Sequence, residues 1–355
     1  MRLIFVIMIW WREQLGSPQF VCAPMVDQSE AAFRVLTRRY GCQLAYTPML
    51  HARLFSEDAK YRAKYFPVPT SEDRPLFAHF CGNDPETLLR ASRFVTKDMA
   101  DAIDINLGCP QGIARQGHYG AFLLEDSDLI VSIVSTLVQG QDLPVTVKIR
   151  KVPGDDSTYS RTLDLVRRLE KAGVSAICVH GRFREAKGQQ TGECDWEVIK
   201  AVKRACNVPV IGNGGIENRQ DAQRMMRETG VDAVMSAEAL LENPALFADM
   251  SITDTDRLAQ EYLNLCNSQP SLMPQVKAHL FRFLYTGLQV HTDLRDKLAA
   301  SSSMPEFCDV AVEMRRRRAG AGNHIGWYSR HRGLLQRSLP EEESDEESLG
   351  LTLFE

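Results

Sequence analysis

The sequence lacks an apolar run long enough to cross a membrane. Its most apolar stretch, residues 1–11, is only about half the roughly 20 residues that a membrane-spanning helix needs. Bulky and polar residues follow, so the small-residue cleavage site of a secretory signal is also missing. We therefore expect no membrane association, and we expect residues 1–16 to be an N-terminal extension packed on the main domain.

Paired cysteines are missing as well. The nine cysteines are an odd number, none of them forms a CxxC pair, and none is spaced regularly with histidine. This pattern argues against a disulfide framework and against a structural zinc site. We expect no bound metal and a reducing compartment, which is the cytoplasm or the nucleus.

The sequence has only a small overall excess of negative charge, with a net charge of −4 over 355 residues. The distribution is more informative. Residues 340–355 carry seven acids and no base, whereas residues 250–339 carry twelve Lys and Arg against eight Asp and Glu. A polyanion-binding surface needs such a basic excess, but a solvated helical face gives the same count. Charge alone leaves both interpretations open.

Apolar runs of strand length alternate with segments of helical spacing over most of the chain. Eight strands that alternate with helices predict an α/β fold, a (β/α)8 TIM barrel, over residues 17–248. The predicted strands are 20–23, 44–47, 76–80, 102–105, 145–149, 176–179, 208–211 and 233–235. The predicted helices between them are 31–40, 85–91, 129–138, 159–172, 196–205 and 218–229.

Three further segments complete the predicted organisation. Residues 48–74, with Pro67, Pro69 and scattered charges, predict a long loop at the rim after the second strand. Residues 249–319 predict a small helical bundle. Its predicted helices are 257–268, 273–288, 292–301 and 306–318. Residues 320–355 are Gly-rich and then acidic, and they predict a disordered tail.

The most distinctive motif is Asp-Ile-Asn-Leu-Gly-Cys-Pro at 104–110. It predicts a strand that breaks into a loop and delivers the thiol of Cys109 to the carboxyl end of the sheet, where a barrel carries its chemistry. Gly117 and Gly120 leave the next segment flexible enough to fold over a ligand. A cysteine taken alone is more often a small buried apolar residue. The flanking residues favour the functional interpretation.

The run 106–110, with Gly120 and Ala121, resembles the active-site loop of the tRNA-dihydrouridine synthases, flavoenzymes that reduce uridines in tRNA. Matching motifs follow one another at 23–25, 147–150, 179–182 and 212–215. Longer matches at 23–30, 117–123 and 235–238 make the chain most similar to the eukaryotic branch that acts on positions 16 and 17 of the D-loop. The resemblance implies FMN as cofactor, NADPH or NADH as reductant and tRNA as partner. We expect a monomer.

The resemblance also implies a flavin pocket at the ends of the strands. Its predicted cofactor-binding residues are Ala23, Pro24, Met25, His79, Asn106, Lys148, His180, Arg182, Asn213, Gly214, Gly215, Ala237 and Glu238. For any one of them alone, a salt bridge or a satisfied polar group in the core is the competing interpretation. Small residues in the last two loops of this fold usually let backbone N–H groups approach a phosphate.

Lys148 and His180 lie on adjacent predicted strands, so both can stabilise negative charge on the reduced flavin ring. A Schiff-base role for Lys148 is the alternative. The loop from Asn106 to Cys109, and the lack of an acid on the predicted fifth strand, favour the flavin. His79 departs from the family, which has glutamine there. A neutral imidazole offers one hydrogen bond to the flavin, where an amide offers two.

The implied reaction is hydride transfer from flavin N5 to C6 of a uracil, with a proton added at C5. Cys109 is the predicted acid, because a cysteine with an ordinary pKa of about 8.5 is mostly a thiol near neutral pH. A uridine in folded tRNA must turn out of its stack to reach a barrel, so a second surface must hold the RNA. The predicted substrate contacts are Arg150, Lys277, His279, Arg282 and Arg295.

Two other functions are compatible with these residues. A flavin barrel that reduces a free small molecule would not need the chain after Phe247. A tRNA-binding relative that has lost catalysis has His79 as its only support. A yellow protein that NADPH bleaches would exclude a flavin-free adaptor.

Overall fold

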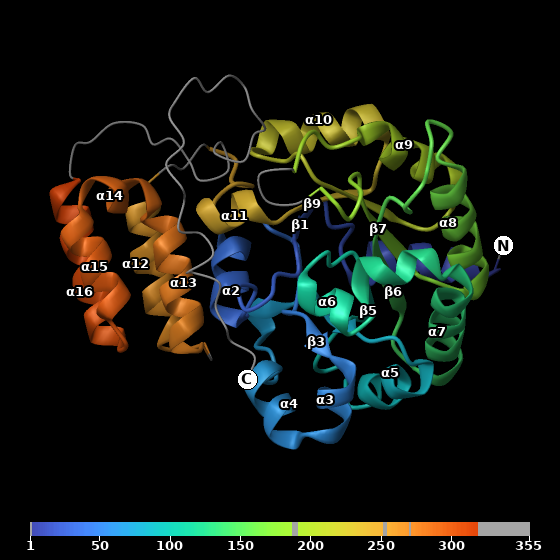
Figure 1. Cartoon of the computed structure of the whole chain (residues 1–355), viewed down its shortest axis with the longest axis horizontal. Coiled ribbons are helices and arrows are strands. Elements are labelled where there is room, and N and C mark those ends of the chain that lie inside the picture. Colours follow the sequence, from blue (N-terminus) through green and yellow to red (C-terminus); the bar gives the residue numbers. More distant parts are fainter. Residues whose placement is uncertain (1, 187–190, 251–253, 270, 319–355) are drawn as a thin grey trace.

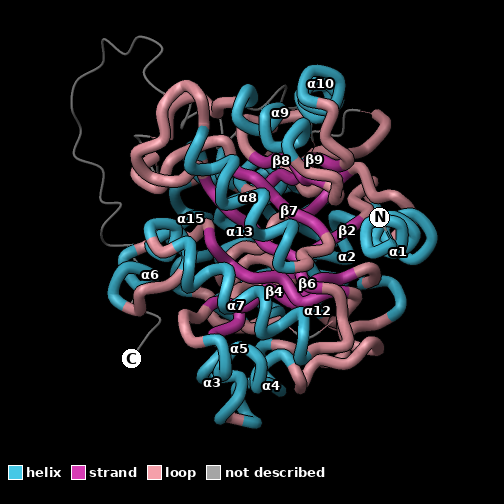
Figure 2. Tube along the Cα trace, turned by 90° about the vertical axis from the view of Figure 1, so that its right-hand side faces the viewer, coloured by secondary structure: helices cyan, strands magenta, loops and turns pink. Residues whose placement is uncertain are grey.

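The computed structural model describes residues 2–186, 191–250, 254–269 and 271–318. The predicted acidic tail lies outside these residues. Eight parallel strands form a closed barrel, in the order β2-β1-β9-β8-β7-β6-β5-β4, and the pairing of β2 with β4 closes it. The strands form the centre of the molecule in Figure 2. They are β1 (Phe20–Cys22), β2 (Leu44–Tyr46), β4 (Leu76–Cys81), β5 (Ala102–Leu107), β6 (Val145–Arg150), β7 (Ala176–His180), β8 (Val210–Asn213) and β9 (Ala233–Ser236).

Helices follow the strands and surround them, so the predicted barrel is confirmed (Figure 1). They are α2 (Ala31–Arg39), α5 (Pro85–Ser92), α7 (Ser127–Gly140), α8 (Ser160–Ala172), α9 (Trp196–Ala205) and α10 (Arg219–Thr229). Side chains cap several of them. The carboxylates of Asp84, Asp126 and Asp195 accept backbone N–H groups at the starts of α5, α7 and α9. Gly173 and Gly230 end α8 and α10 in the left-handed conformation.

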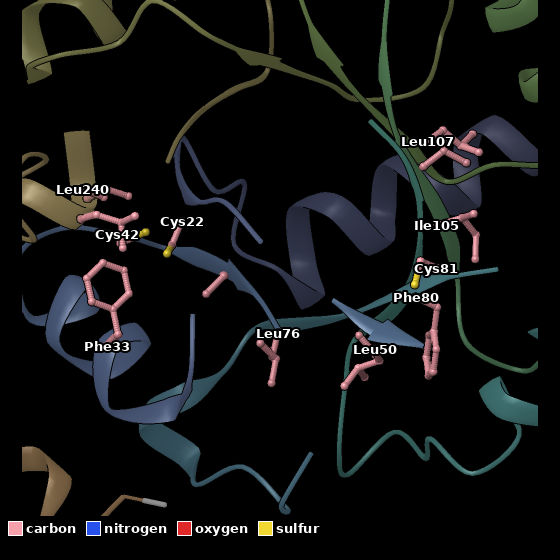
Figure 3. Close-up of a cluster of buried hydrophobic side chains, with 14 of the residues drawn as sticks. Cys22, Phe33, Cys42, Leu50, Leu76, Phe80, Cys81, Ile105, Leu107 and Leu240 are labelled. Atoms are coloured by element: carbon pink, nitrogen blue, oxygen red, sulfur yellow. The ribbon is translucent and has the colours of Figure 1, made fainter. Parts of the chain in front are cut away.

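The apolar core lies mainly between the strands and the surrounding helices. Figure 3 shows part of it, where Phe33 lies beside Cys22 and Leu240, and Phe80 and Ile105 project from neighbouring strands. Alternate residues of the same strands face the barrel interior. A second core cluster is formed there by Val21, Tyr46, Phe77, Cys178 and Met235. The period of two along each strand therefore separates the outer core from the inner one.

The segment 48–74 is not the long loop that its prolines predicted. It contains a short strand, β3 (Leu50–His51), the helices α3 (Ala52–Glu57) and α4 (Ala59–Tyr65), and a 3-10 turn, η2 (Ser71–Asp73). Pro67 and Pro69 follow α4, and the carboxylate of Asp58 caps that helix by accepting the N–H of Lys60. Phe55 of α3 is fully buried. The two helices protrude beside the barrel near α5 in Figure 1.

The C-terminal helices pack beside the barrel (Figure 1). After the short α11 (Glu238–Glu242) come α12 (Thr255–Cys266), α13 (Met273–Phe283), α14 (Tyr285–Val290), α15 (Thr292–Ala300) and α16 (Met304–Arg317). The single helix predicted over 273–288 is wrong, because the chain breaks at Leu284. That residue is buried, so the apolar pattern continues through the break and does not reveal it. α12 packs against α2 of the barrel.

The N-terminal segment forms α1 (Arg2–Ile9) and a π-helical turn, η1 (Trp10–Gln14). Trp10 and Trp11 are buried in the inner core, and the Trp10 ring stacks on Phe77 with centroids 5.8 Å apart. Their neighbours include Leu44 and Ala176, which are the first residues of their strands. The tryptophans therefore close the amino end of the barrel. Among the described residues, no helix has the length and apolarity needed to cross a membrane.

Replacing Trp10 with Ala should lower the free energy of unfolding by about 3–5 kcal/mol, because it leaves a cavity against Phe77 in the inner core. Chemical denaturation monitored by circular dichroism would measure the change. The matched control is Phe5→Ala on α1, which directly precedes Trp10, since the Phe5 side chain is 68% exposed. Equal stability of the two variants would show that Trp10 does not close the barrel.

Candidate functional site

A cavity of about 650 Å³ opens at the carboxyl ends of the strands. All the predicted cofactor-binding residues line it, together with Cys109, Arg150 and Arg282. They come from β1, β4, β5, β6, β7, β8, β9 and α13, or from the loops that follow the strands. The closed barrel thus brings together residues that are far apart in the sequence.

The backbone around Cys109 is held from three sides. The side-chain Oδ1 of Asn106 accepts the N–H groups of Gly108 and Cys109, at 2.9 and 3.0 Å. The carbonyl of Gly108 accepts a hydrogen bond from Nε of Arg150 at 2.8 Å, and the carbonyl of Cys109 accepts the N–H of Ala121 at 3.1 Å. Two of the predicted cofactor and substrate contacts, Asn106 and Arg150, therefore also position the thiol.

The segment after Cys109 folds back over its loop through α6 (Gly112–Gln116) and the 3-10 helix η3 (Gly120–Glu125). Gly120 has a φ of +64°, and a Cβ at this position would lie 2.8 Å from the carbonyl oxygen of Cys109. A side chain here would push the two loops apart, so glycine is needed for the close approach.

One wall of the cavity carries desolvated positive charge. The Nζ of Lys148 donates to Oδ1 of Asn213 at 3.0 Å, and burial lowers the pKa of Lys148. Burial, followed by the charge of Arg182, lowers the pKa of Arg150 to about 10. In the part of the chain that the structure describes, no carboxylate forms a salt bridge with Lys148, Arg150 or Arg182. The cavity is therefore prepared for an anionic ligand.

His180 is a neutral member of this wall. Burial, and then the charges of Arg150, Lys148 and Arg182, lower the pKa of His180 well below its ordinary value. A terminal nitrogen of Arg182 lies 3.2 Å from Nε2 of His180. A guanidinium only donates hydrogen bonds, so Nε2 accepts this one and the ring proton sits on Nδ1. With its proton on Nδ1, the imidazole of His180 is an uncharged hydrogen-bond donor.

Gly214 and Gly215 bring the backbone close to the cavity after β8. Gly214 has a φ of +106°, and a Cβ there would lie 2.7 Å from both Cys194 Sγ and His180 Cδ2. Ala237 and Glu238 follow β9 and line the same part of the cavity. The residues present thus fit FMN, because small residues leave room for a phosphate and the cationic wall faces a large cavity.

The residues predicted to contact RNA lie in different environments in the structure. Arg282 lines the cavity, where its Nε donates to Oε1 of Gln28 at 3.0 Å. Arg295 is exposed on α15. Lys277 is half-buried, and its Nζ donates to the carbonyl of Ala299 at 2.7 Å, which ties α13 to α15.

His279 was predicted to contact RNA, and the structure contradicts this. The side chain is fully buried, with Nε2 3.0 Å from Oε2 of Glu30 and the ring stacked on Phe33 at 4.6 Å. It has no surface that a phosphate could reach. His279 instead joins the C-terminal helices to the barrel.

Gln28 and Met49 are among the cavity residues that were missed from the sequence. Gln28 lies within the motif at 23–30 and could have been selected from it, since that motif follows the first strand. Met49 lies in the segment that was predicted to be a loop, and its sulfur accepts a hydrogen bond from Nδ2 of Asn106 at 3.0 Å. Nothing in the local sequence indicated that Met49 reaches the cavity.

A sequence model of the family described as "Dihydrouridine synthase (Dus)" matches residues 21–315, and so covers most of the chain. The chain belongs to the dihydrouridine synthase family. The match includes every strand from β2 to β9 and all the described helices from α2 to α15. The family predicted from the motifs is therefore confirmed.

Similar proteins within the family share much of the sequence. The tRNA-dihydrouridine(16/17) synthase NAD(P)(+)-like protein of Mus musculus is 46% identical over 310 residues, which cover 87% of this chain and 64% of that protein. The tRNA-dihydrouridine(16/17) synthase of Schizosaccharomyces pombe is 43% identical over 310 residues, covering 83% of this chain and 76% of the relative. The chain thus spans less than two thirds of the length of the mouse relative.

A solved structure, a 2-naphthoyl-CoA reductase in complex with 2-naphthoyl-CoA, is similar in fold. Its TM-score is 0.51 at 10% sequence identity, over 75% of this chain and 53% of that chain. At this identity the similarity supports the barrel alone.

Replacing Lys148 with Met should stabilise the ligand-free protein. Burial lowers the pKa of Lys148, so the unfolded chain holds the proton more tightly and the charged lysine costs stability below its folded pKa. We expect the melting temperature to rise by about 2–4 °C, the shift that roughly 1 kcal/mol produces in a large domain. The gain should shrink as the pH rises towards 10.5, the ordinary pKa of lysine.

The control is Lys171→Met, since Lys171 is exposed near the end of α8. Added FMN should then raise the melting temperature of the wild type more than that of the Lys148 variant. A lower melting temperature for ligand-free Lys148→Met would mean that the ammonium group is already stabilised in the empty cavity.

Proposed function

We propose that the chain is an FMN-dependent tRNA-dihydrouridine synthase. It reduces the C5–C6 double bond of D-loop uridines at positions 16 and 17, with NADPH or NADH as the source of hydride. The observation that supports this most directly is one cavity in which the Cys109 loop faces a cationic wall that forms no salt bridge with a carboxylate of the described residues. The names of the mouse and Schizosaccharomyces pombe relatives support the substrate, the positions and the reductant.

The residues of the cationic wall bind and orient the cofactor in this proposal. Bound FMN would supply the chemistry of hydride transfer between the nicotinamide and C6 of the uracil. Lys148 and neutral His180 stabilise negative charge on the bound cofactor, and the backbone at Gly214, Gly215 and Ala237 leaves room for the phosphate. The positive charge of Lys148 is preorganised, because folding has already removed water from it.

Cys109 holds the proton that goes to C5. As C6 takes the hydride, the π electrons of the double bond form the new C5–H bond with the proton of the thiol, and a thiolate remains. The guanidinium of Arg150 interacts favourably with the charge of that thiolate and donates to the neighbouring carbonyl of Gly108. The thiolate regains its proton from solvent before the next turnover.

The RNA reaches the cavity beside the C-terminal helices. We propose that residues 249–319 recruit tRNA, because α13 carries Arg282 to the cavity and α15 carries exposed Arg295 beyond it. The bases Arg316 and Arg317 contribute less to this surface. Both donate to Glu313, and Arg317 also donates to Asp293, so part of their charge is neutralised within the helices.

Replacing Cys109 with Ala should slow uridine reduction by roughly 10²-fold or more, because one general acid is lost. FMN binding and its bleaching by NADPH should persist, since the thiol lies on the loop rather than in the cationic wall. Stopped-flow absorbance would follow the flavin, and dihydrouridine analysis would follow the tRNA. The control is Cys308→Ala, in a half-buried cysteine of α16. Wild-type turnover by the Cys109 variant would remove the thiol from the mechanism.

Replacing Arg295 and Lys277 with Gln should weaken tRNA binding and flatten its dependence on salt. Each lost phosphate contact reduces the slope of log affinity against log salt by close to one. Arg295→Gln should show the full effect, whereas Lys277→Gln tests a side chain that also ties two helices together. Filter binding at several salt concentrations would measure the slopes.

The control for these variants is Lys171→Gln, because α8 ends near the closed end of the barrel. NADPH-driven bleaching of the flavin without RNA should be the same in all the proteins. An unchanged salt slope in the Arg295 variant would move the RNA surface to α3 and α4, where Arg53 and Lys64 are exposed.

A further inference from the structure

A buried polar network lies in the barrel directly beneath the cavity. Nδ1 of His79 is 2.6 Å from Oδ2 of Asp104, and the hydroxyl of Thr146 donates to Oδ1 of the same carboxylate at 2.7 Å. The three residues are register partners on the neighbouring strands β4, β5 and β6. His79 is only 3% exposed, and Asp104 is not exposed at all. The proposed reaction makes no use of this network.

The second ring nitrogen of His79 opens on the cavity. No hydrogen bond among the described residues involves Nε2 of His79, and this atom is not among the fully buried polar atoms without a partner. His79 lines the cavity, so the exposed remainder of its ring faces that space. The ring is also fixed from behind, because its backbone N–H donates to the hydroxyl of Thr47 and Tyr46 packs edge-on against it.

The carboxylate of Asp104 decides which ring nitrogen carries the proton. An ionised carboxylate only accepts hydrogen bonds, so Nδ1 of His79 must be the donor. In the neutral imidazole, Nε2 then has a lone pair and no hydrogen. The Thr146 hydroxyl occupies the other carboxylate oxygen, which keeps Asp104 from turning away from the ring. The pair therefore presents a hydrogen-bond acceptor to the cavity.

We propose that Asp104 is a positioning residue that fixes the Nδ1–H tautomer of His79, and that Nε2 thereby recognises the N3–H group of the bound flavin. This rests on the proposed function. Along its pyrimidine edge an oxidised flavin has two carbonyl acceptors and one donor, which is N3–H. An acceptor on the protein can pair only with that donor, whereas a glutamine could also donate to a neighbouring carbonyl. Asp104 thus determines that Nε2 of His79 accepts a hydrogen bond rather than donates one.

Nitrogen NMR of the histidine rings tests the proposal in the unaltered protein. Protein labelled with ¹⁵N in histidine should show His79 as the Nδ1–H tautomer before FMN is added. On FMN binding, the Nε2 resonance should move in the direction of an accepted hydrogen bond. The His79→Gln variant identifies the resonance. An Nε2–H tautomer, or a ring protonated on both nitrogens, would overturn the proposal.

Two variants separate the acceptor from the fold. Asp104→Asn keeps an oxygen that accepts from Nδ1, so it should keep the tautomer and most of the FMN affinity. Asp104→Leu combined with Thr146→Val removes the acceptor and the unpaired hydroxyl together, and should shift the proton to Nε2. We expect FMN to bind roughly 3- to 10-fold more weakly to the double variant, the cost of about one hydrogen bond. Fluorescence quenching of FMN measures the affinity without turnover.

The outcomes distinguish this inference from the proposed function. If FMN does not bind to the wild type, the proposed function fails. If FMN binds while Nε2 of His79 does not respond, the proposed function stands and the inference fails. Equal FMN affinity of the double variant and Asp104→Asn would also overturn it. A double variant that does not fold leaves the wild-type NMR result to decide.

Discussion

Desolvated positive charge at the carboxyl end of the barrel is the constraint on which the rest of the structure depends. Lys148, Arg150 and Arg182 have lost much of their water, and no described carboxylate forms a salt bridge with them. Burying charge in this way costs free energy unless a ligand of opposite charge compensates for it. Burial of the two apolar cores offsets that cost and holds the strands, and with them the cationic wall, in place.

Much of the barrel could be predicted from the sequence because its strands are short apolar runs between recognisable caps and glycines. The Cys109 loop was visible for the same reason, since a strand broken by Gly and Pro marks a carboxyl end. The helices α3 and α4 were missed because six or seven residues give too few turns for a helical period. His279 was misplaced because its partners, Glu30 and Phe33, lie far away in the sequence.

The loop between β1 and α2 serves the cavity and the C-terminal helices together. Met25 and Gln28 line the cavity, and Gln28 accepts a hydrogen bond from Arg282 of α13. A few residues on, buried Glu30 accepts a hydrogen bond from Tyr262 and contacts His279. Burial alone would raise the pKa of Glu30, but the interactions with His279 and Tyr262 outweigh burial, so the pKa is lowered. A displacement of the C-terminal helices would therefore break buried hydrogen bonds of Glu30 and would move Arg282 in the cavity wall.

The two tryptophans at the amino end leave the barrel with a single entrance. Both are buried in the inner core, where Trp10 stacks on Phe77. In the proposed reaction, the nicotinamide and the flipped uridine must then enter the cavity through the same opening. The closed floor thus makes the two substrates share one entrance, although the tryptophans touch neither of them.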